Sequence, residues 1–326
     1  MTENRKPNMI AIATDAGQFP AAAFLAARLV ALNPRDDTRI MLFSDSLADI
    51  EAAYEWGGVG SNFGLLESPT EFSGDGRVSG ATFYRLALPR LSGAERLLYL
   101  DVDTYPDDAR IFDLFDLDME GHAVAAVRDL EATCLDTPTQ RGELERAGRL
   151  GDRRYFNAGM MLVDTARFEA AGIEDRCMMA IAQQGLHDQA ALNRILDGGW
   201  LELSPAFNMT PIGYLAGVDK VLKPALSHFM GKSKPWNGPL FYLDHPARRE
   251  IEAFIPGSPW PMFLAGNPSA DEVRFEPWTP PAQFLAAVAA HLGGTRFADV
   301  ERGLTLAPRL EAFGRPGAPT PPAAGA

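Results

Sequence analysis

The apolar run at residues 97–100 is followed directly by Asp101 and, after one valine, by Asp103, and this junction most constrains the fold of the chain. The run does not alternate with polar residues, which predicts a strand buried on both faces of a sheet. In open α/β sheets, ligands bind outside the carboxyl ends of the strands. Asp101 and Asp103 are two positions apart, so they point to one side if the strand continues through them. Such a pair favours a divalent cation that prefers oxygen ligands.

The Asp-x-Asp spacing is a weak signal by itself in an acidic chain. Asp116 and Asp118 repeat the spacing in a polar stretch that follows no buried strand. The metal hypothesis for Asp101 and Asp103 therefore depends on their position after an apolar strand, and an ordinary solvated acidic pair is the alternative.

The length of the chain, 326 residues, is enough for a large core. We favour one α/β domain with an appendage over two smaller domains. The formal net charge of -13 argues against nucleic-acid binding, which needs clustered Lys and Arg. The same acidity argues against a polybasic membrane-binding patch.

The cysteine content predicts a reducing, cytoplasmic location, because Cys134 and Cys177 are too few for a disulfide framework or a thiolate zinc site. The first apolar run is interrupted by Asp15, Gly17 and Pro20, which indicates a strand and a loop and not a signal peptide. No stretch reaches the roughly 20 apolar residues of a transmembrane helix.

Strand and helix signals alternate at the start of the chain. Residues 9–14 are apolar, residues 20–32 form an Ala-rich helix that opens with a proline, and residues 39–43 are a second apolar run. This strand, helix, strand order is typical of Rossmann-like folds. No G-x-G-x-x-G pattern follows the first strand, which argues against a nicotinamide cofactor.

The middle of the chain shows clear patterns for secondary structure in a few segments only. We expect a helix over residues 80–88 that Pro89 closes, and another over residues 166–184. Residues 133–152 are polar without a clear period and are expected to form a loop. Beyond residue 246, residues 280–292 carry the one strong helix signal.

The composition divides the chain into three parts. Residues 1–245 are the predicted α/β domain, residues 246–312 a C-terminal extension of helix and loop packed on it, and residues 313–326 a disordered tail rich in Pro, Ala and Gly.

Four short motifs occur in a fixed order over most of residues 9–245. They are Ser79-Gly80-Ala81-Thr82-Phe83-Tyr84-Arg85-Leu86 with Leu100-Asp101-Val102-Asp103, then Tyr155-Phe156-Asn157-Ala158-Gly159, then His187-Asp188-Gln189 with Leu192-Asn193, and then residues 228–236. This ordered set resembles the family 8 retaining glycosyltransferases, which include bacterial lipopolysaccharide galactosyl- and glucosyltransferases and glycogenin.

The resemblance implies a GT-A fold, which is a single Rossmann-like α/β domain around a mostly parallel twisted sheet flanked by helices. The donor would be a UDP-sugar, and Asp101, Asp103 and His228 would hold Mn²⁺ or Mg²⁺ on its diphosphate. Two carboxylates and one imidazole suit manganese, and the cation offsets the charge that builds on UDP as it leaves.

The resemblance also implies contacts with the donor. Gly231 and Lys234 match positions that approach the diphosphate, where a glycine admits the backbone and a lysine adds a positive charge. Asp15 and Arg85 match positions near the nucleoside and the sugar. For Arg85, a solvated residue on the helix surface is the alternative.

Three further residues match positions around the transferred sugar. Asn157 and Asp188 would hydrogen-bond its hydroxyl groups. Gln189 matches the residue nearest the reacting carbon. Because an amide is a poor nucleophile, its carbonyl oxygen would stabilise positive charge on the sugar and not form a bond to it.

The chain departs from the family pattern at two places. The family follows the Asp of the first strand with an Asn and a Tyr that stacks on uracil, whereas Asp15 is followed by Ala16, Gly17 and Gln18. Phe19 is then the candidate for stacking, one place late. The basic membrane-adhering tail of the family is missing, so a membrane lipid is not indicated as the acceptor.

The sequence therefore predicts a metal-dependent retaining hexosyltransferase. It would move a hexose from UDP-glucose or UDP-galactose to a saccharide or other hydroxyl acceptor, in cell-surface or other glycan synthesis. One alternative is a nucleotidyltransferase, although the Gly-rich signature that such enzymes carry after the first strand is absent. The other is a sugar-nucleotide-binding protein without turnover, against which the complete set of candidate site residues argues.

Overall fold

The computed structural model describes residues 7–66, 83–231, 234–237, 240, 243–265 and 282–294. The start of the first resembling motif, residues 79–82, and the predicted tail at residues 313–326 lie outside these ranges.

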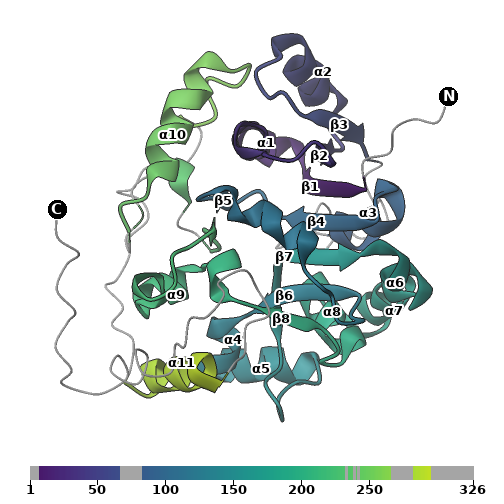
Figure 1. Cartoon of the computed structure of the whole chain (residues 1–326), viewed down its shortest axis with the longest axis vertical. Coiled ribbons are helices and arrows are strands. Elements are labelled where there is room, and N and C mark those ends of the chain that lie inside the picture. The colour runs from purple at the N-terminus through teal and green to yellow at the C-terminus, as the bar shows by residue number, and fades with distance from the viewer. Residues whose placement is uncertain are drawn as a thin grey trace.

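A mixed sheet of seven strands lies at the centre of the molecule, in the order β3-β2-β1-β4-β7-β6-β8 (Figure 1). Within it, β7 runs against both its neighbours, and the other pairs are parallel. The sheet is thus mostly parallel, as the sequence predicted. The strands are β1 (Asn8–Thr14), β2 (Thr38–Ser44), β3 (Asn62–Leu65), β4 (Arg96–Leu100), β6 (Val124–Arg128), β7 (Phe156–Asp164) and β8 (Leu201–Leu203).

The burial of β4 confirms that residues 97–100 form a strand with both faces covered. Leu97 and Tyr99 join the hydrophobic cluster on one face of the sheet, while Leu98 and Leu100 join the cluster on the other. All four are at most 2% exposed. Because neighbouring side chains of a strand point to opposite faces, this division produces three layers, helix, sheet and helix.

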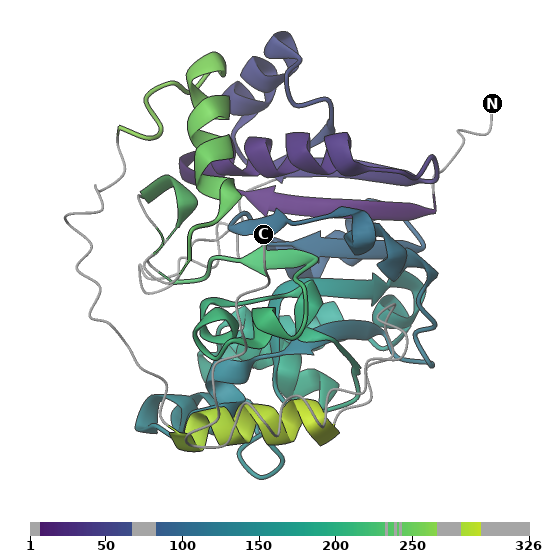
Figure 2. The same ribbon diagram turned by 60° about the vertical axis from the view of Figure 1, so that its left-hand side comes forward.

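Helices α1 and α2 cover one face, and four later helices cover the other. Figure 2 shows α1 lying alongside β1. The first pair is α1 (Phe19–Leu32) and α2 (Leu47–Trp56), and the second group is α3 (Tyr84–Ser92), α6 (Thr165–Ala170), α7 (Ile173–Gln184) and α8 (Asp188–Leu196).

Two helix predictions need correction. The helix predicted to end before Pro89 continues to Ser92, and Gly93, with a left-handed φ of 60°, ends it. The helix predicted over residues 166–184 is divided at Gly172, whose φ is also positive at 58°.

The segment predicted as a loop over residues 133–152 is in large part helical. It contains the end of α4 (Leu130–Cys134) and all of α5 (Pro138–Arg146). Asp129 and Thr137 cap these two helices with their side-chain oxygens, which compensates for a sequence without an apolar period.

A small second sheet places the chain near residue 228 against the end of the central sheet. It consists of β5 (Thr104–Pro106) and β9 (Leu226–His228), paired antiparallel with Thr104 opposite His228. Through this register, His228 lies next to the turn that follows β4, although it comes more than a hundred residues later in the chain.

The C-terminal part of the described chain packs on this framework. Helix α10 (Pro246–Phe254), which the sequence did not predict, covers α1 through Ile251 and Phe24, and its unusual N-cap is the side chain of His245. Helix α11 (Ala282–Gly294) agrees with the predicted helix and packs beside α4. The division of domains at residue 245 stays a prediction.

The remaining helices are short connections. They are α9 (Pro211–Leu215) and the 3₁₀ helices η1 (Ala16–Gln18), η3 (Ala109–Asp116), η4 (Pro205–Phe207), η5 (Val218–Lys220), η6 (Pro235–Asn237) and η7 (Ile255–Gly257).

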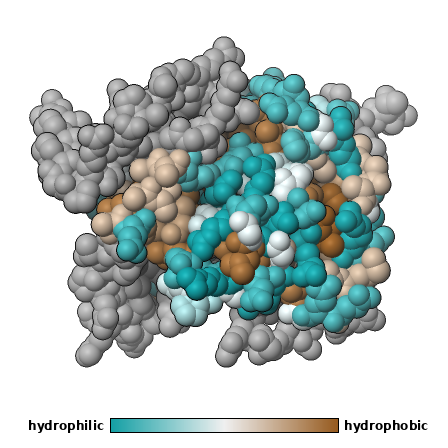
Figure 3. Space-filling view, turned by 90° about the horizontal axis from the view of Figure 1, so that it is seen from below, coloured by the Kyte–Doolittle hydropathy of each residue, from teal (hydrophilic) through white to brown (hydrophobic). Residues whose placement is uncertain are grey.

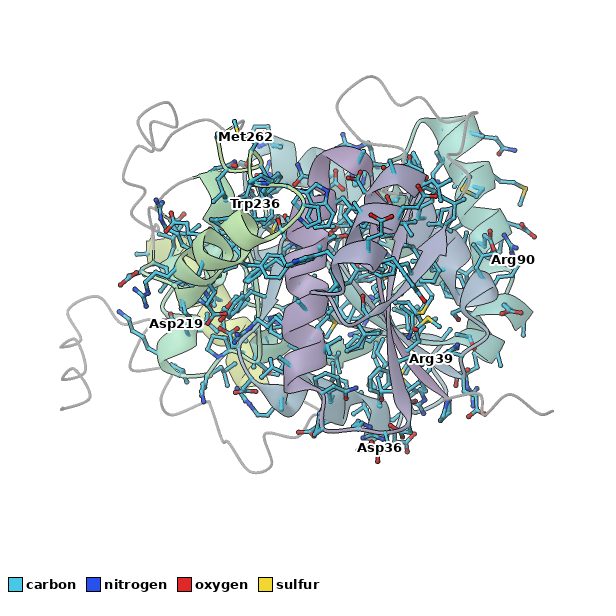
Figure 4. The ribbon with its side chains drawn as sticks, turned by 90° about the horizontal axis from the view of Figure 1, so that it is seen from above. Asp36, Arg39, Arg90, Asp219, Trp236 and Met262 are labelled. Atoms are coloured by element: carbon cyan, nitrogen blue, oxygen red, sulfur yellow. The ribbon has the colours of Figure 1, made fainter. Side chains whose placement is uncertain are left out.

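The surface of the described chain is mixed in character. From below, hydrophobic residues occupy separate patches among hydrophilic ones (Figure 3). From above, Trp236 and Met262 lie on the side of the molecule opposite Arg90 (Figure 4). Within the described ranges, every helix is too short or too polar to cross a membrane.

Candidate active site

The two aspartates of the Asp-x-Asp motif lie in a turn and not in a strand. β4 ends at Leu100, and the backbone N–H of Thr104 donates to the carbonyl oxygen of Asp101 at 3.1 Å. The expectation that strand alternation aligns Asp101 and Asp103 is therefore wrong. The turn brings both side chains to the carboxyl end of β4, where the fold rule for open α/β sheets places ligands.

His228 completes a cluster with these aspartates. Its Nε2 lies 3.2 Å from Oδ1 of Asp103, because Thr104 and His228 face each other across the β5–β9 pair. One ligand atom each from Asp101, Asp103 and His228 lie within 4.8 Å of one another. Two carboxylates and an imidazole form a donor set that fits a divalent cation such as Mn²⁺.

Gly159 allows this cluster to be compact. A Cβ atom at this position would lie 2.2 Å from Cε1 of His228 and 2.8 Å from Oδ2 of Asp101. The backbone carbonyl of Gly159 also accepts from the N–H of Asp101 at 2.8 Å. The close approach of strand β7 to both side chains therefore requires a residue without a side chain.

Two side chains contact the carboxylate of Asp103. Its Oδ2 is in contact with the ammonium group of Lys234, and its Oδ1 faces His228. Burial favours the neutral carboxyl, but the positive charge of Lys234 outweighs burial and holds the pKa of Asp103 well below its usual range. Lys234, predicted to approach a diphosphate, thus lies directly beside the cluster.

Arg85 is buried and connects two carboxylates. Its guanidinium lies 2.9 Å from Asp101 and 2.9 Å from Asp188, and it donates to the carbonyl oxygen of Ala158 at 2.8 Å. Burial opposes its charge, but Asp101 and Asp188 outweigh burial and raise the pKa of Arg85 above its ordinary value. The alternative of a solvated surface arginine is therefore wrong.

Asn157 reaches the site because β7 is reversed. Its position at the start of an antiparallel strand lies beside the carboxyl end of β4. Its Oδ1 accepts from the N–H of Gly159 at 3.0 Å, and its Nδ2 donates to Asp129 at 3.3 Å. The amide is 4% exposed and is held in one orientation.

Gln189 lies in the first turn of α8, where His187 and not Gln189 caps the helix. Its Oε1 accepts from the backbone N–H of Ala158 at 2.9 Å. Its Nε2 donates to Asp129 at 3.2 Å and to the hydroxyl of Tyr155 at 3.3 Å. Its carbonyl oxygen therefore lies beside the β7 backbone, within the same group of side chains as Asn157.

Two predicted donor-binding residues lie at the edge of this group. Asp15 follows β1, whose carboxyl end is next to that of β4, and its side chain caps η1 by accepting from Gln18 at 3.2 Å. Gly231 has a φ of 84°, a conformation that glycine adopts without strain. Phe19 is fully buried and packs on Trp260 with ring centroids 5.2 Å apart, so the prediction that it stacks on uracil is wrong.

Several residues that hold the site together had no role predicted from the sequence. Asp129 follows the β6 strand, and its position at a strand end was a usable signal. Tyr155 and Gly159 belong to one of the four motifs, but no role was predicted for either of them. Asn208, which contacts both Asn157 and His228, is a lone Asn with no local signal.

Comparison with known proteins identifies the chain. The sequence profile of Glycosyl transferase family 8 matches residues 38–238, more than half of the chain. The chain belongs to this family. Family 8 membership confirms the resemblance drawn from the four motifs and makes the protein a glycosyltransferase.

Several relatives of this family 8 member are known. General stress protein A of Bacillus subtilis (strain 168) is 29% identical over 216 residues, which cover 60% of this chain and 71% of that protein. Glycosyltransferase GlyF of Streptococcus pneumoniae serotype 4 is 26% identical over 175 residues, which cover 49% of this chain and 38% of GlyF.

The fold is that of a solved galactosyltransferase. The crystal structure of LgtC in complex with donor and acceptor sugar analogs superposes with a TM-score of 0.61, covering 76% of this chain and 95% of LgtC at 24% identity. This likeness confirms the predicted GT-A architecture of the family 8 chain.

Proposed function

We propose that this protein is a metal-dependent, retaining hexosyltransferase that uses UDP-glucose or UDP-galactose and a saccharide or other hydroxyl acceptor. The observation that carries the proposal is the cluster of Asp101, Asp103 and His228, joined through Arg85 to Asp188. A divalent-cation site and a group of sugar-binding polar side chains at one sheet edge fit a nucleotide-sugar donor. The cytoplasmic location stays a prediction from the sequence.

The three cluster residues would hold Mn²⁺ or Mg²⁺. When bound, the cation would offset the negative charge on the leaving diphosphate. Lys234 lies against Asp103 and would supply a further positive charge toward the same phosphates. Gly231, three residues after His228, would let the backbone approach them closely.

Asp188 and Asn157 would orient the sugar of the donor. Asp188 is 4% exposed and keeps its position through the ion pair with Arg85. Asn157 is held by backbone and side-chain partners on both ends of its amide. Groups that are fixed before the substrate arrives lose little entropy on binding, which favours the reactive orientation.

Retention of the anomeric configuration is supported by the absence of a free carboxylate beside Gln189 among the described residues. Inverting transfer needs a carboxylate base to deprotonate the acceptor. Asp129, a carboxylate in contact with Gln189, accepts from Gln189 and Asn157 through Oδ2 and caps α4 through Oδ1. In a retaining reaction the departing phosphate can take the acceptor proton, while the Gln189 carbonyl oxygen supports the cationic sugar.

A donor screen tests this function. The protein is incubated with manganese and single sugar nucleotides, UDP release is measured, and proton NMR reports the anomeric configuration of the early product. We expect UDP release from UDP-glucose or UDP-galactose, loss of release in excess EDTA, and an α-linked product. Tight donor binding without UDP release from any sugar nucleotide would support a binding protein without turnover, and a β-linked product would overturn retention.

A further inference from the structure

A series of buried side chains connects the sugar side of the site to the metal side. Asn157 Oδ1 accepts from Asn208 Nδ2 at 3.0 Å, and Asn208 Oδ1 lies 2.9 Å from Nδ1 of His228. Asn208 is 2% exposed and His228 is 3% exposed. At this burial, each polar atom depends on its protein partner, because water does not replace a lost hydrogen bond.

The backbone fixes Asn208 next to His228. The N–H of Met209 donates to the carbonyl oxygen of Leu226 at 2.9 Å, and the N–H of His228 donates to the carbonyl oxygen of Met209 at 2.9 Å. These two bonds pair the chain segment that carries Asn208 with the segment that carries His228. The contact between the two side chains is therefore built into the backbone arrangement.

The direction of each hydrogen bond follows from one backbone donor. The N–H of Gly159 can only donate, so the atom of Asn157 that faces it is the oxygen Oδ1. The same Oδ1 requires a donor from Asn208, so Nδ2 of Asn208 points to Asn157. The oxygen of Asn208 must then face His228, whose Nδ1 carries the proton.

We infer that Asn208 is a positioning residue that holds His228 as the tautomer protonated on Nδ1. Nε2, which faces Asp103 at 3.2 Å, then presents its lone pair to a divalent cation. The inference rests on the proposed metal site and adds to it the residue that prepares its imidazole ligand.

The test measures Mn²⁺ binding directly, by electron paramagnetic resonance of the free ion in a titration without sugar nucleotide. Asn208→Leu removes both hydrogen bonds and is expected to weaken Mn²⁺ binding by about 10- to 100-fold, the typical effect of losing a partner of a metal-bound histidine. Asn208→Asp keeps an acceptor facing Nδ1 and is expected to bind Mn²⁺ no more weakly than the wild type.

Two controls separate this effect from general damage. Asn8→Leu changes an Asn that is also buried, at 6% exposure, but lies at the amino end of β1, and it is expected to leave Mn²⁺ affinity unchanged. Asp103→Asn is expected to weaken Mn²⁺ binding by at least about 100-fold and so identifies the site that is measured. Equal weakening in Asn8→Leu and Asn208→Leu would overturn the inference.

The tautomer can also be read in the wild-type protein, in case Asn208→Leu does not fold. Long-range ¹H–¹⁵N NMR of the imidazoles at about pH 8, with His228 assigned through His228→Gln, is expected to show the proton on Nδ1. A proton on Nε2, or unchanged Mn²⁺ affinity in Asn208→Leu, would overturn the role of Asn208 alone. Absence of Mn²⁺ binding by the wild type would overturn the metal site and the inference together.

Discussion

The ammonium group of Lys234 favours the ionised form of Asp103. Lys234 contacts one carboxylate oxygen, and His228 faces the other. In the absence of a cation, the ammonium group of Lys234 supplies the positive charge that the carboxylate needs. This arrangement keeps the site assembled without a bound cation, since an unpaired buried carboxylate would be costly.

Replacing Asp103 by Asn tests the metal site. Asp103→Asn removes a charged ligand but little volume, so we expect Mn²⁺ binding at least about 100-fold weaker, beyond the effect typical of residues outside the ligand set. Glycosyl transfer is expected to fall below detection while thermal unfolding stays cooperative. Asp118→Asn, in the second Asp-x-Asp pair, is the control and is expected to keep full turnover. Equal activity of the two variants would contradict the assignment.

Substitution of Gln189 should change the rate of glycosyl transfer and not the binding of the donor. Gln189→Ala removes a carbonyl oxygen whose interaction with the sugar would strengthen as positive charge develops, so we expect kcat to fall about 10- to 100-fold with KM for the donor within about threefold. Steady-state kinetics provide the measurement, and Gln184→Ala, on the exposed end of α7, is the control. A rise in KM at unchanged kcat would indicate a role in donor binding only.

At the scale of elements, the sequence predicted what local patterns encode. The unbroken apolar run of β4 and the proline that opens α1 were sufficient for these elements. The reversed direction of β7 was not predictable, because pairing direction depends on the sheet neighbour and leaves no local pattern. For the same reason, the ordered motifs contain most residues of the candidate site but not Asn208, whose side-chain contacts are with residues distant in sequence.

Helices α5 and α8 are joined by a pair of titrating side chains. Nε2 of His187 lies 2.7 Å from Glu143, and this hydrogen bond raises the pKa of His187 above its ordinary value of 6.5. Burial of Glu143 opposes its charge, but His187 and Tyr155 outweigh burial and lower its pKa to about 2. Near neutral pH, His187 is therefore more often protonated in the folded protein, where it faces Glu143, than in the unfolded chain.

This pair predicts a pH-dependent contribution to stability. The stabilisation from the charged His187 is fully present below pH 6.5, which is the pKa of His187 in the unfolded chain. This stabilisation is lost as the pH rises through the higher pKa of His187 in the folded protein. The difference in free energy of unfolding between the wild type and His187→Asn should shrink from pH 6 to about pH 9 by at most about 1 kcal/mol, because His187 is partly exposed. Asn preserves the helix cap. Urea unfolding measures the difference, His122→Asn serves as control, and a difference that grows with pH would contradict the prediction.

At the scale of the whole molecule, a helix near the end of the described chain supports the β8 edge of the sheet. Glu202 on β8 pairs with Arg128 on β6 at 2.9 Å and with His291 on α11 at 3.0 Å. Burial opposes the charge of Glu202, but His291 and Arg128 outweigh burial and lower its pKa to about 2. Through α4, this part of the molecule is packed directly beside Asp129, the partner of Asn157 and Gln189.

The contribution of α11 to global stability can be measured by one core substitution. Phe284 is 2% exposed in the cluster that α11 shares with α4 and α9. Phe284→Ala is expected to lower the free energy of unfolding by about 3 kcal/mol, since it leaves a cavity. Met179→Ala, at a residue 53% exposed, should change it by less than about 0.5 kcal/mol. Indistinguishable urea midpoints would mean that α11 does not dock.

The close approach at Gly159 also gives a criterion for sorting related sequences. Any side chain at this position competes for the space of His228 and Asp101, so a protein of the same fold that carries a larger residue there must move the imidazole, the carboxylate or the strand. Such a protein is not expected to hold a cation with the same three ligands, even if all of them are retained. The residue aligned with Gly159 therefore distinguishes proteins expected to bind the cation from proteins that retain the three ligand residues but lack the space for the site.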